Sequence, residues 1–227
     1  MLRYSNISAG YGGVPVLRDV SFEVAAGEAV AIFGHNGAGK TTLMRCAVGD
    51  IAEVSGTVSY RDHQIVPGQV YLNVRQGIGF VPQGHNVFRE LTVRQNLAIS
   101  GLNHPEAKIE DIYKMFPILQ ERGPQLAGSL SGGQQQILAL GMALMTKPSI
   151  LLLDEPSTGL APVIVRDVMN SLATINRESG TTVVVVEQNI PATLKVVSRA
   201  IVLKSGRVVF DGPSRDLENK DELWGLF

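Results

Sequence analysis

Cysteine and long apolar runs are scarce in this sequence of 227 residues. Cys46 is the single cysteine, which excludes an internal disulfide. Because a buried cysteine usually behaves as a small hydrophobic residue, we expect Cys46 to pack inside a helix. No apolar run approaches the roughly 20 residues that span a bilayer, and the first residues lack the apolar segment of a secretory signal. We therefore expect a soluble chain, or one that binds a membrane only through a partner.

The sequence also has no large excess of either positive or negative charge. The formal net charge is −1, from 20 Lys and Arg against 21 Asp and Glu. No broad basic surface is implied, so nucleic acid is not an expected partner. Hydrophobic residues make up 44% and charged residues 18%, which is typical of a globular protein. A chain of this length can bury one substantial core, and we expect a single domain over residues 1–227.

Short apolar runs alternate with helical segments along the chain. The predicted strands are residues 2–7, 17–24, 29–33, 56–60, 78–81, 150–153, 182–186, 201–203 and 207–210. Helices are predicted at residues 41–48, 134–145 and 163–177. Between about residues 88 and 145 the pattern is helical and interrupted by prolines, which indicates an inserted lobe. The apolar run 150–153 is typical of a strand buried on both faces of a parallel sheet, so an α/β core is predicted.

A glycine-rich segment lies between a predicted strand and a predicted helix. Residues 34–41 read G-H-N-G-A-G-K-T and match the phosphate-binding pattern G-x-x-x-x-G-K-[ST] in full. Glycines let the backbone aim its N–H groups at phosphate oxygens, and the helix adds the positive end of its dipole. We expect Lys40 to contact the β- and γ-phosphates and Thr41 to ligate Mg²⁺. The predicted ATP-binding residues here are Gly34, His35 (through its backbone), Asn36, Gly37, Ala38, Gly39, Lys40, Thr41 and Thr42.

Two carboxylates follow the apolar strand 150–153. Ligands of open α/β sheets bind at the C-terminal edge of the strands, where these side chains are expected to lie. Asp154 is suited to hold Mg²⁺ through water. Glu155, one residue further on, is suited to polarise an attacking water molecule. Together with the glycine loop, this pair predicts an ATPase that uses ATP and Mg²⁺.

A second glycine-rich turn, L-S-G-G-Q at residues 130–134, opens a helix on the predicted lobe. A helix N-terminus of this kind can bind an anion, but this one lies far from the first glycine loop along the chain. In a symmetric head-to-tail pair, each lobe could close on the phosphate loop of its partner. We therefore predict that Ser131, Gly132, Gly133 and Gln134 bind ATP in trans. Ser131 can also be an ordinary N-cap, which does not exclude phosphate contact.

These motifs, in this order, resemble the nucleotide-binding domains of ABC transporters over essentially the whole chain. The resemblance implies a P-loop NTPase with a RecA-like core, an N-terminal antiparallel β subdomain and a helical lobe inserted at about residues 88–145. It implies that Tyr11 stacks on adenine, with Val16 also binding ATP. It also implies that Gln83 contacts Mg²⁺ and joins the core to the lobe, and that residues 157–160 cross a dimer interface. A second copy or a sister subunit would complete each site.

One position departs from the pattern of the family. The family usually has a histidine in contact with the γ-phosphate after the last core strand, but residues 186–189 read V-E-Q-N and place Gln188 there. The four histidines, His35, His63, His85 and His104, all lie elsewhere. A glutamine amide can donate to phosphate but cannot become cationic. Gln188 is therefore a candidate catalytic residue in a site whose hydrolysis is weaker or depends on a partner.

The V-E-Q-N sequence also points to a subfamily. Together with D-E-P-S-T-G-L-A-P at residues 154–162, it resembles the smaller ATPase subunit of branched-chain amino acid importers. V-P-Q-G at residues 81–84 and E-R-G at residues 121–123 are similar to this group and to the urea importers. The resemblance implies a second ATPase, permease subunits and a substrate-binding protein, with this chain peripheral on the cytoplasmic face of the membrane. The substrate itself is selected by the other subunits.

Other functions stay open at this point. A soluble ABC-type ATPase of DNA repair or translation would need a long coiled-coil insertion or a tandem ATPase domain, and the sequence predicts neither. A catalytically silent nucleotide-binding module is favoured by Gln188 and opposed by Glu155. A P-loop kinase or GTPase would leave L-S-G-G-Q without a role. The nearest match to a guanine-reading motif, N-K-D-E at residues 219–222, ends in Glu where Asp is needed.

Overall fold

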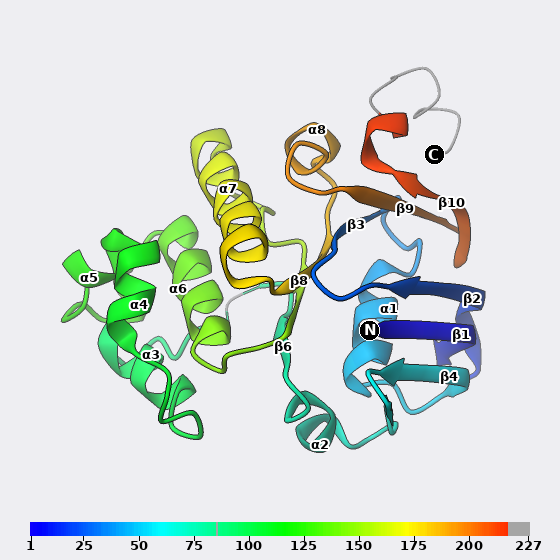
Figure 1. Ribbon diagram of the computed structural model, residues 1–227, viewed down its shortest axis with the longest axis horizontal. Helices are drawn as coiled ribbons and strands as arrows, with labels where there is room; N and C mark the ends of the chain where they lie inside the picture. The colour runs from blue at the N-terminus through cyan, green and yellow to red at the C-terminus, as the bar shows by residue number, and fades with distance from the viewer. Residues whose placement is uncertain (85, 218–227) are drawn as a thin grey trace.

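Two β-sheets form the framework of the computed structural model, which describes residues 1–84 and 86–217 (Figure 1). His85 and the N-K-D-E segment therefore lie outside the described residues. The first sheet is antiparallel, with strand order β2-β1-β4-β5. Its strands are β1 (Leu2–Tyr11), β2 (Val14–Val24), β4 (Val54–Tyr60) and β5 (His63–Gln64). The antiparallel β subdomain implied by the sequence is thus confirmed.

The second sheet has the order β10-β9-β3-β8-β7-β6. Its strands are β3 (Ala29–Phe33), β6 (Ile78–Val81), β7 (Ile150–Asp154), β8 (Thr182–Val186), β9 (Arg199–Lys204) and β10 (Arg207–Pro213). All neighbours are parallel except β9 and β10, which form an antiparallel hairpin. Every residue of β3, β7 and β8 is buried, as the apolar runs predict. Within β3, Val30 and Ile32 join one hydrophobic cluster while Ala31 and Phe33 join the other, because side chains alternate across a sheet.

The helices cover both faces of this parallel sheet. On one face, α1 (Lys40–Val48) lies between the two sheets, as Figure 1 shows. On the other face lie α7 (Pro162–Ser179) and the helices at the left of the picture. This three-layer arrangement buries the core strands from both sides and leaves the loops at the sheet edge open. None of the helices in the described ranges is both long and apolar enough to cross a membrane.

The helical lobe falls between β6 and β7 in the chain. It contains α3 (Val93–Ser100), α4 (Ile109–Met115), α5 (Pro117–Glu121), the 3₁₀ turn η1 (Ala127–Ser129) and α6 (Gly132–Leu144). The sequence did not predict α2 (Val70–Val74), α8 (Ile190–Thr193), the 3₁₀ turn η2 (Ser214–Leu217) or β5. Each of these has five residues or fewer, which is too short to display a hydrophobic period.

Cys46 is buried in α1, inside the cluster between the two sheets. Burial raises the pKa of its thiol to about 12, so the side chain stays neutral at physiological pH. The prediction of a packed helical cysteine is confirmed.

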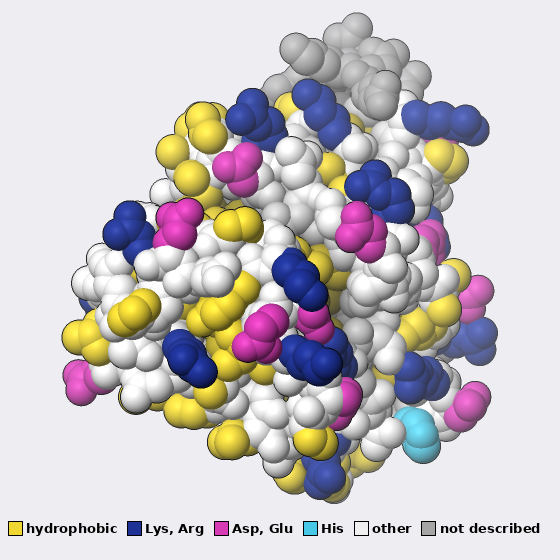
Figure 2. Space-filling model, turned by 60° about the vertical axis from the view of Figure 1, so that its left-hand side comes forward, with side chains coloured by type: hydrophobic (Ala, Val, Ile, Leu, Met, Phe, Trp, Pro, Cys, Tyr) yellow, Lys and Arg dark blue, Asp and Glu magenta, His cyan; other side chains and the backbone are white. Residues whose placement is uncertain are grey.

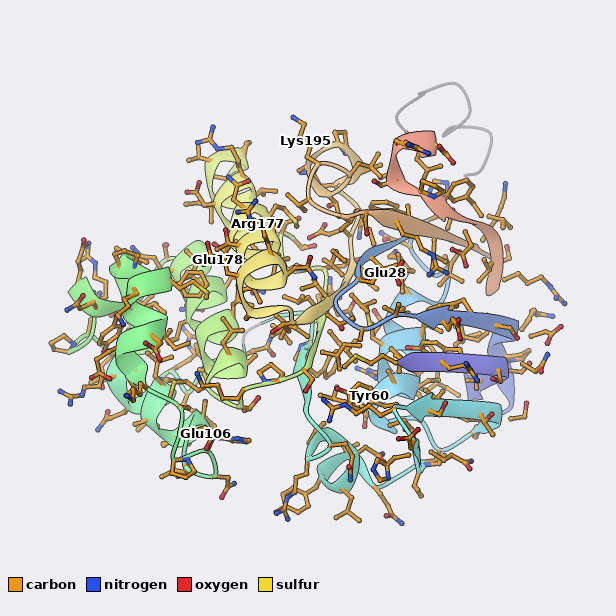
Figure 3. All side chains as sticks on the ribbon, in the orientation of Figure 1. Glu28, Tyr60, Glu106, Arg177, Glu178 and Lys195 are labelled. Carbon is orange, nitrogen blue, oxygen red and sulfur yellow. The ribbon has the colours of Figure 1, made fainter. Side chains whose placement is uncertain are left out.

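Polar contacts hold the first sheet against the second at two points. The hydroxyl of Tyr60, at the end of β4 in Figure 3, donates to the Gly77 carbonyl at 3.4 Å. On β9, the Arg199 guanidinium donates to the Glu23 carbonyl at 2.9 Å and to the Glu28 carboxylate at 3.2 Å. Glu28 lies at the start of β3 in the same figure. These contacts join β4 of the first sheet to the residue before β6, and β2 to β9 of the second sheet.

Charged side chains of both signs are interspersed on the face of the molecule drawn in Figure 2. Lys and Arg alternate there with Asp and Glu, and hydrophobic side chains lie between them. This mixture matches the net charge of −1 and gives this face no extended basic field of the kind that binds nucleic acid.

Candidate nucleotide site

The order of the parallel strands brings four loops to one edge of the sheet. The strands β3, β8, β7 and β6 are consecutive neighbours, so the segments that follow them leave the sheet side by side. These segments and Val16 of β2 line a pocket of about 440 Å³. The lining residues are Val16, Asn36, Gly37, Gly39, Lys40, Thr41, Thr42, Gln83, Glu155 and Gln188. The sequence predicts every one of them as a site residue, although they come from five separate segments.

In the part of the chain that the structure describes, no side chain caps the N-terminus of α1, which follows the glycine loop. Gly39 has φ 105° and stands at the N-cap, where no side chain makes a capping hydrogen bond. A Cβ at Gly39 would meet Leu17 Cδ2 at 2.7 Å, so a larger residue would push the loop off the first sheet. The first turn of α1 also contains no acidic residue. Its N–H groups and its positive dipole end are therefore available to an anion.

Lys40 lies buried at the base of this loop. Its ammonium donates to the Gly34 carbonyl at 2.8 Å and to the His35 carbonyl at 3.2 Å, and it lies 3.7 Å from Glu155 Oε1. The His35 backbone thus takes part in the loop, as the sequence predicts. These hydrogen bonds hold the Lys40 ammonium in the pocket, close to the Glu155 carboxylate. A phosphate group that entered the pocket would take the place of this carboxylate as the partner of Lys40.

Asp154 ends β7 with both carboxylate oxygens buried. Within the described chain no hydrogen bond of ordinary length and angle reaches them, although the Thr41 side chain interacts with the carboxylate. Burial raises the pKa of Asp154; a hydrogen-bonding interaction with the Thr41 side chain opposes this rise, the charge of Glu155 adds to it, and the charge of Lys40 opposes it. A buried carboxylate that lacks donors is unfavourable unless a cation joins it. Among the described residues, no group of three or more His, Cys, Asp or Glu side chains could hold a metal alone. The donors fit a hard cation such as Mg²⁺ that also takes oxygens from a phosphate group.

Glu155 turns out of the sheet directly after β7. Its φ of 49° is a left-handed conformation that non-glycine residues rarely adopt and that clusters at functional sites. Three side chains donate to its carboxylate: Gln188 Nε2 to Oε1 at 2.7 Å, and Gln83 Nε2 and Thr158 Oγ1 to Oε2 at 2.8 Å and 3.1 Å. Gln83 and Gln188 therefore both donate to the carboxylate of Glu155, the residue that the sequence predicts to polarise the attacking water.

The structure places the two ATP-binding residues predicted on the first sheet, Tyr11 and Val16, differently relative to the pocket. Val16 lines the pocket, whereas Tyr11 ends β1, keeps 45% of its surface exposed and is not among the described residues that line the pocket. The turn amides of Gly12 and Gly13 donate to the two carboxylate oxygens of Glu53 at 3.1 Å and 3.0 Å. Sequence reasoning missed Glu53, because a carboxylate that binds backbone amides across a loop belongs to no motif.

Replacing Tyr11 by Ala is expected to weaken ATP binding by the isolated chain. Stacking of a base on an aromatic ring contributes about 1–3 kcal/mol, so the dissociation constant should rise by roughly 5- to 150-fold. Tyr11→Phe keeps the ring and should bind ATP as the wild type does. Calorimetric titration of both variants checks this, and equal affinities for Ala and Phe would remove Tyr11 from the site.

The L-S-G-G-Q segment lies on the lobe, away from this pocket. Ser131 is the N-cap of α6 and forms a capping box with Gln134, in which each side chain accepts from the backbone of the other at 3.3 Å and 3.1 Å. Gly133 packs so closely on α7 that a Cβ would meet Ile164 Cγ2 at 2.7 Å. Within the described chain, none of residues 131–134 lines the pocket around Lys40. Figure 1 shows α6 and α1 on opposite sides of the parallel sheet. Their contact with ATP in trans stays a prediction.

Comparison with known proteins agrees with this geometry. The ABC transporter family matches residues 17–158. The chain is 43% identical to the high-affinity branched-chain amino acid transport ATP-binding protein BraG of Pseudomonas aeruginosa, over 92% of this chain and 91% of that protein. It is 33% identical to the probable branched-chain amino acid transport ATP-binding protein LivF of Archaeoglobus fulgidus, over 96% and 94%. The phosphonates import ATP-binding protein PhnC of Lactococcus lactis matches at 32%, over 99% and 98%.

Solved structures give the same result. The ATP-binding cassette MJ0796, in a dimeric post-hydrolysis state bound to ADP and Pi, has a TM-score of 0.83 and 26% identity to this chain. The match covers 95% of this chain and 99% of that one. From the glycine loop, the acidic pair, the strand order that joins them and these relatives, it follows that the chain belongs to the ABC transporter family and is one of its ATP-hydrolysing subunits.

Proposed function

We propose that this chain powers an importer of branched-chain or other hydrophobic amino acids from the cytoplasmic face of the cell membrane. One observation carries the ATPase part of the proposal. A single pocket unites a buried lysine, an uncapped helix N-terminus and a carboxylate held by two glutamines. The substrate part is supported by the 43% identity to BraG along almost the full length of both chains.

In this mechanism, ATP binds with its adenine on Tyr11, near Val16, and its phosphates in the loop 34–42. Lys40 and the first amides of α1 receive the phosphate charge. Glu155 would then orient a water molecule for in-line attack on the γ-phosphorus and accept its proton, while the bond from that phosphorus to the bridging oxygen breaks and ADP leaves. Gln188 lies beside Glu155 at 2.7 Å, where the family usually has a histidine, so it can orient this carboxylate but cannot relay a proton as a cation.

Mg²⁺ would be held by Thr41, Gln83 and Asp154. Bound there, Mg²⁺ would supply positive charge next to the phosphate oxygens, where negative charge builds up during the reaction. The buried Asp154 carboxylate, with no hydrogen bond of ordinary geometry from the described residues and with the Thr41 side chain interacting with it, supports the presence of Mg²⁺.

A partner ATPase would complete the site. Ser131, Gly132, Gly133 and Gln134 of one subunit would close over the γ-phosphate held by the other, and residues 157–160 would cross between them. Bound ATP would then stabilise the closed pair, and hydrolysis would release it. Because Gln188 lacks the chemistry of histidine, we infer a sister subunit of different sequence as the partner.

The permease would contact the surface around Gln83. Three large apolar side chains are exposed on segments before and after β6: Tyr71 and Leu72 on α2, and Phe88 beyond Gln83. Since Gln83 also donates to Glu155, a shift of the lobe from about Phe88 to Leu144 would reach the hydrolytic carboxylate. A binding protein would deliver the substrate on the far side.

The proposal is tested by reconstituting the chain in liposomes with the permeases, the second ATPase and the binding protein of an importer from the same organism. We expect leucine-loaded binding protein to stimulate both ATP hydrolysis and leucine uptake, and Glu155→Gln to abolish the contribution of this chain.

Two outcomes would count against the proposal in different ways. Stimulation by urea or phosphonate in place of leucine would leave the ATPase intact and reassign the substrate. A rate no higher than that of Glu155→Gln, alone and with partners, would instead support a catalytically silent nucleotide-binding module.

A further inference from the structure

Glu187 is a buried carboxylate outside the nucleotide pocket. It follows β8 directly, is 1% exposed, and is absent from the pocket lining, although its neighbour Gln188 belongs to it. Burying a carboxylate is unfavourable unless donors surround it, so its partners should explain its place.

The carboxylate of Glu187 bridges two loops through their backbone amides. Its Oε1 accepts from the amide of Ser157 at 2.8 Å, in the segment after β7. Its Oε2 accepts from the amides of Gln188 at 3.0 Å and Asn189 at 3.4 Å, in the segment after β8. Burial raises the pKa of Glu187, and these hydrogen bonds oppose the rise. Amide donors on both sides require two acceptor oxygens, which a carboxylate provides and an amide side chain does not.

The hydrogen bonds of the Glu187 side chain lie just beyond the last backbone hydrogen bonds between the strands. The amide of Glu155 donates to the Val186 carbonyl at 2.9 Å, and the amide of Glu187 donates to the Ile32 carbonyl at 3.2 Å. The strand ends are therefore already held by backbone pairing. The Glu187 side chain holds the two loops beyond the strands, which the sheet alone does not fix.

Both of these loops deliver a donor to Glu155. Gln188 donates to Oε1 at 2.7 Å, and Thr158, the residue after Ser157, donates to Oε2 at 3.1 Å. The Glu187 carboxylate therefore binds the backbone amide of Gln188 itself and that of Ser157, the residue before Thr158. Gln188 and Thr158 are two of the three side chains that donate to the Glu155 carboxylate. The loop 157–160 is also the segment expected to meet the partner subunit.

We propose that Glu187 is a positioning residue for ATP hydrolysis, which fixes Gln188 and Thr158 around Glu155 and ties the interface loop 157–160 to that carboxylate. The inference rests on the proposed function, in which Glu155 orients the attacking water. Glu187 is not among the described residues that line the pocket, and its hydrogen bonds reach backbone amides of the loops beside Glu155. Its loss should therefore slow the chemical step and spare nucleotide binding.

Glu187→Gln is the primary test, because it keeps the size of the side chain and replaces one acceptor oxygen by a donor that faces amide N–H groups. We expect kcat to fall by about ten- to a hundredfold, the range produced by small misplacements of catalytic groups. KM and the ATP dissociation constant should stay within about twofold of wild type, as expected when only the chemical step is impaired. Amide hydrogen exchange should accelerate at Ser157 and Gln188.

Asn73→Ala is the matched control for stability. The Asn73 side chain is also buried and also fixes loops through the backbone, since it donates to the Val48 and Val66 carbonyls at 3.1 Å and 2.8 Å, but it does not line the nucleotide pocket. It should lower the thermal midpoint without a selective loss of kcat. If Glu187→Gln does not fold, the same measurements are made on Glu187→Asp, which keeps both oxygens on a shorter arm.

The outcomes separate this inference from the proposed function. Wild-type kcat in Glu187→Gln, unchanged exchange at Ser157 and Gln188, or an equal loss of kcat in Asn73→Ala would overturn the role of Glu187 while the ATPase stands. A wild-type chain with no activity above Glu155→Gln would instead refute the proposed function.

Discussion

Glu155→Gln is expected to lower ATP hydrolysis by at least about a hundredfold while ATP binding persists. A positioned general base contributes about 10²–10⁴-fold, and a glutamine of the same shape cannot accept the proton of the attacking water. The substitution keeps the volume of a side chain that lies among Gln83, Thr158 and Gln188. Phosphate release at saturating ATP, with nucleotide binding measured separately, checks both parts.

This variant should also accumulate as an ATP-bound pair, because ATP would hold the subunits together and hydrolysis would no longer separate them. Size-exclusion chromatography with and without ATP reports this directly. Glu178→Gln is a suitable control, since Glu178 is an exposed carboxylate on α7 and does not line the nucleotide pocket. Full activity in Glu155→Gln would mean that another group activates the water.

Ser131→Arg is expected to leave ATP binding by the monomer intact and to abolish turnover that depends on pairing. A long cation at this exposed N-cap would obstruct the approach of α6 to the γ-phosphate of the partner and remove the Ser131 hydroxyl as a donor. Loss of one preorganised donor to transition-state charge typically slows a reaction by 10²–10³-fold, so we expect at least about a hundredfold loss of the cooperative rate. The dependence of rate on protein concentration measures it.

The capping role of Ser131 requires its own control. Ser131→Ala loses the hydrogen bond with the Gln134 amide, which weakens α6 by about 1 kcal/mol, but adds no bulk. Ser131→Thr keeps both the cap and the hydroxyl. If Ser131→Ala loses as much of the cooperative ATPase rate as Ser131→Arg, the loss is due to the missing hydroxyl or the missing cap and not to the bulk of the arginine. If cooperative turnover survives in Ser131→Arg, the shared site is contradicted.

The parallel sheet was predictable because its strands are short runs of apolar residues bounded by glycine or charge. Residues 150–153 and 182–186 are buried on both faces, and such runs carry no competing helical period. The glycine loop and the acidic pair were predictable for a chemical reason, since phosphate and metal binding restrict both residue type and spacing. The lobe was predictable as helical but not as separate helices, because its elements are short.

The supports of the site could not be predicted from the sequence. Glu53 accepts hydrogen bonds from the amides of Gly12 and Gly13, and Glu187 accepts one from the amide of Ser157, all far away along the sequence. Every residue except proline has a backbone amide, so these acceptors follow no sequence pattern. The convergence of Gln83 and Gln188 on Glu155 likewise depends on strand order, which places β6 and β8 on either side of β7. Sequence order alone, with these residues 105 positions apart, does not indicate that they share a partner.

The burial of Cys46 has a practical consequence for measuring closure. Since the single thiol is buried and neutral, a cysteine introduced on the surface would be the one position that a thiol-reactive probe labels in the folded chain. Leu102 on the lobe and Val14 on the β1–β2 hairpin are both strongly exposed and could carry such probes on separate subunits. Distances between spin labels at these points, taken with and without ATP, would turn the opening and closing of the pair into a length in ångströms.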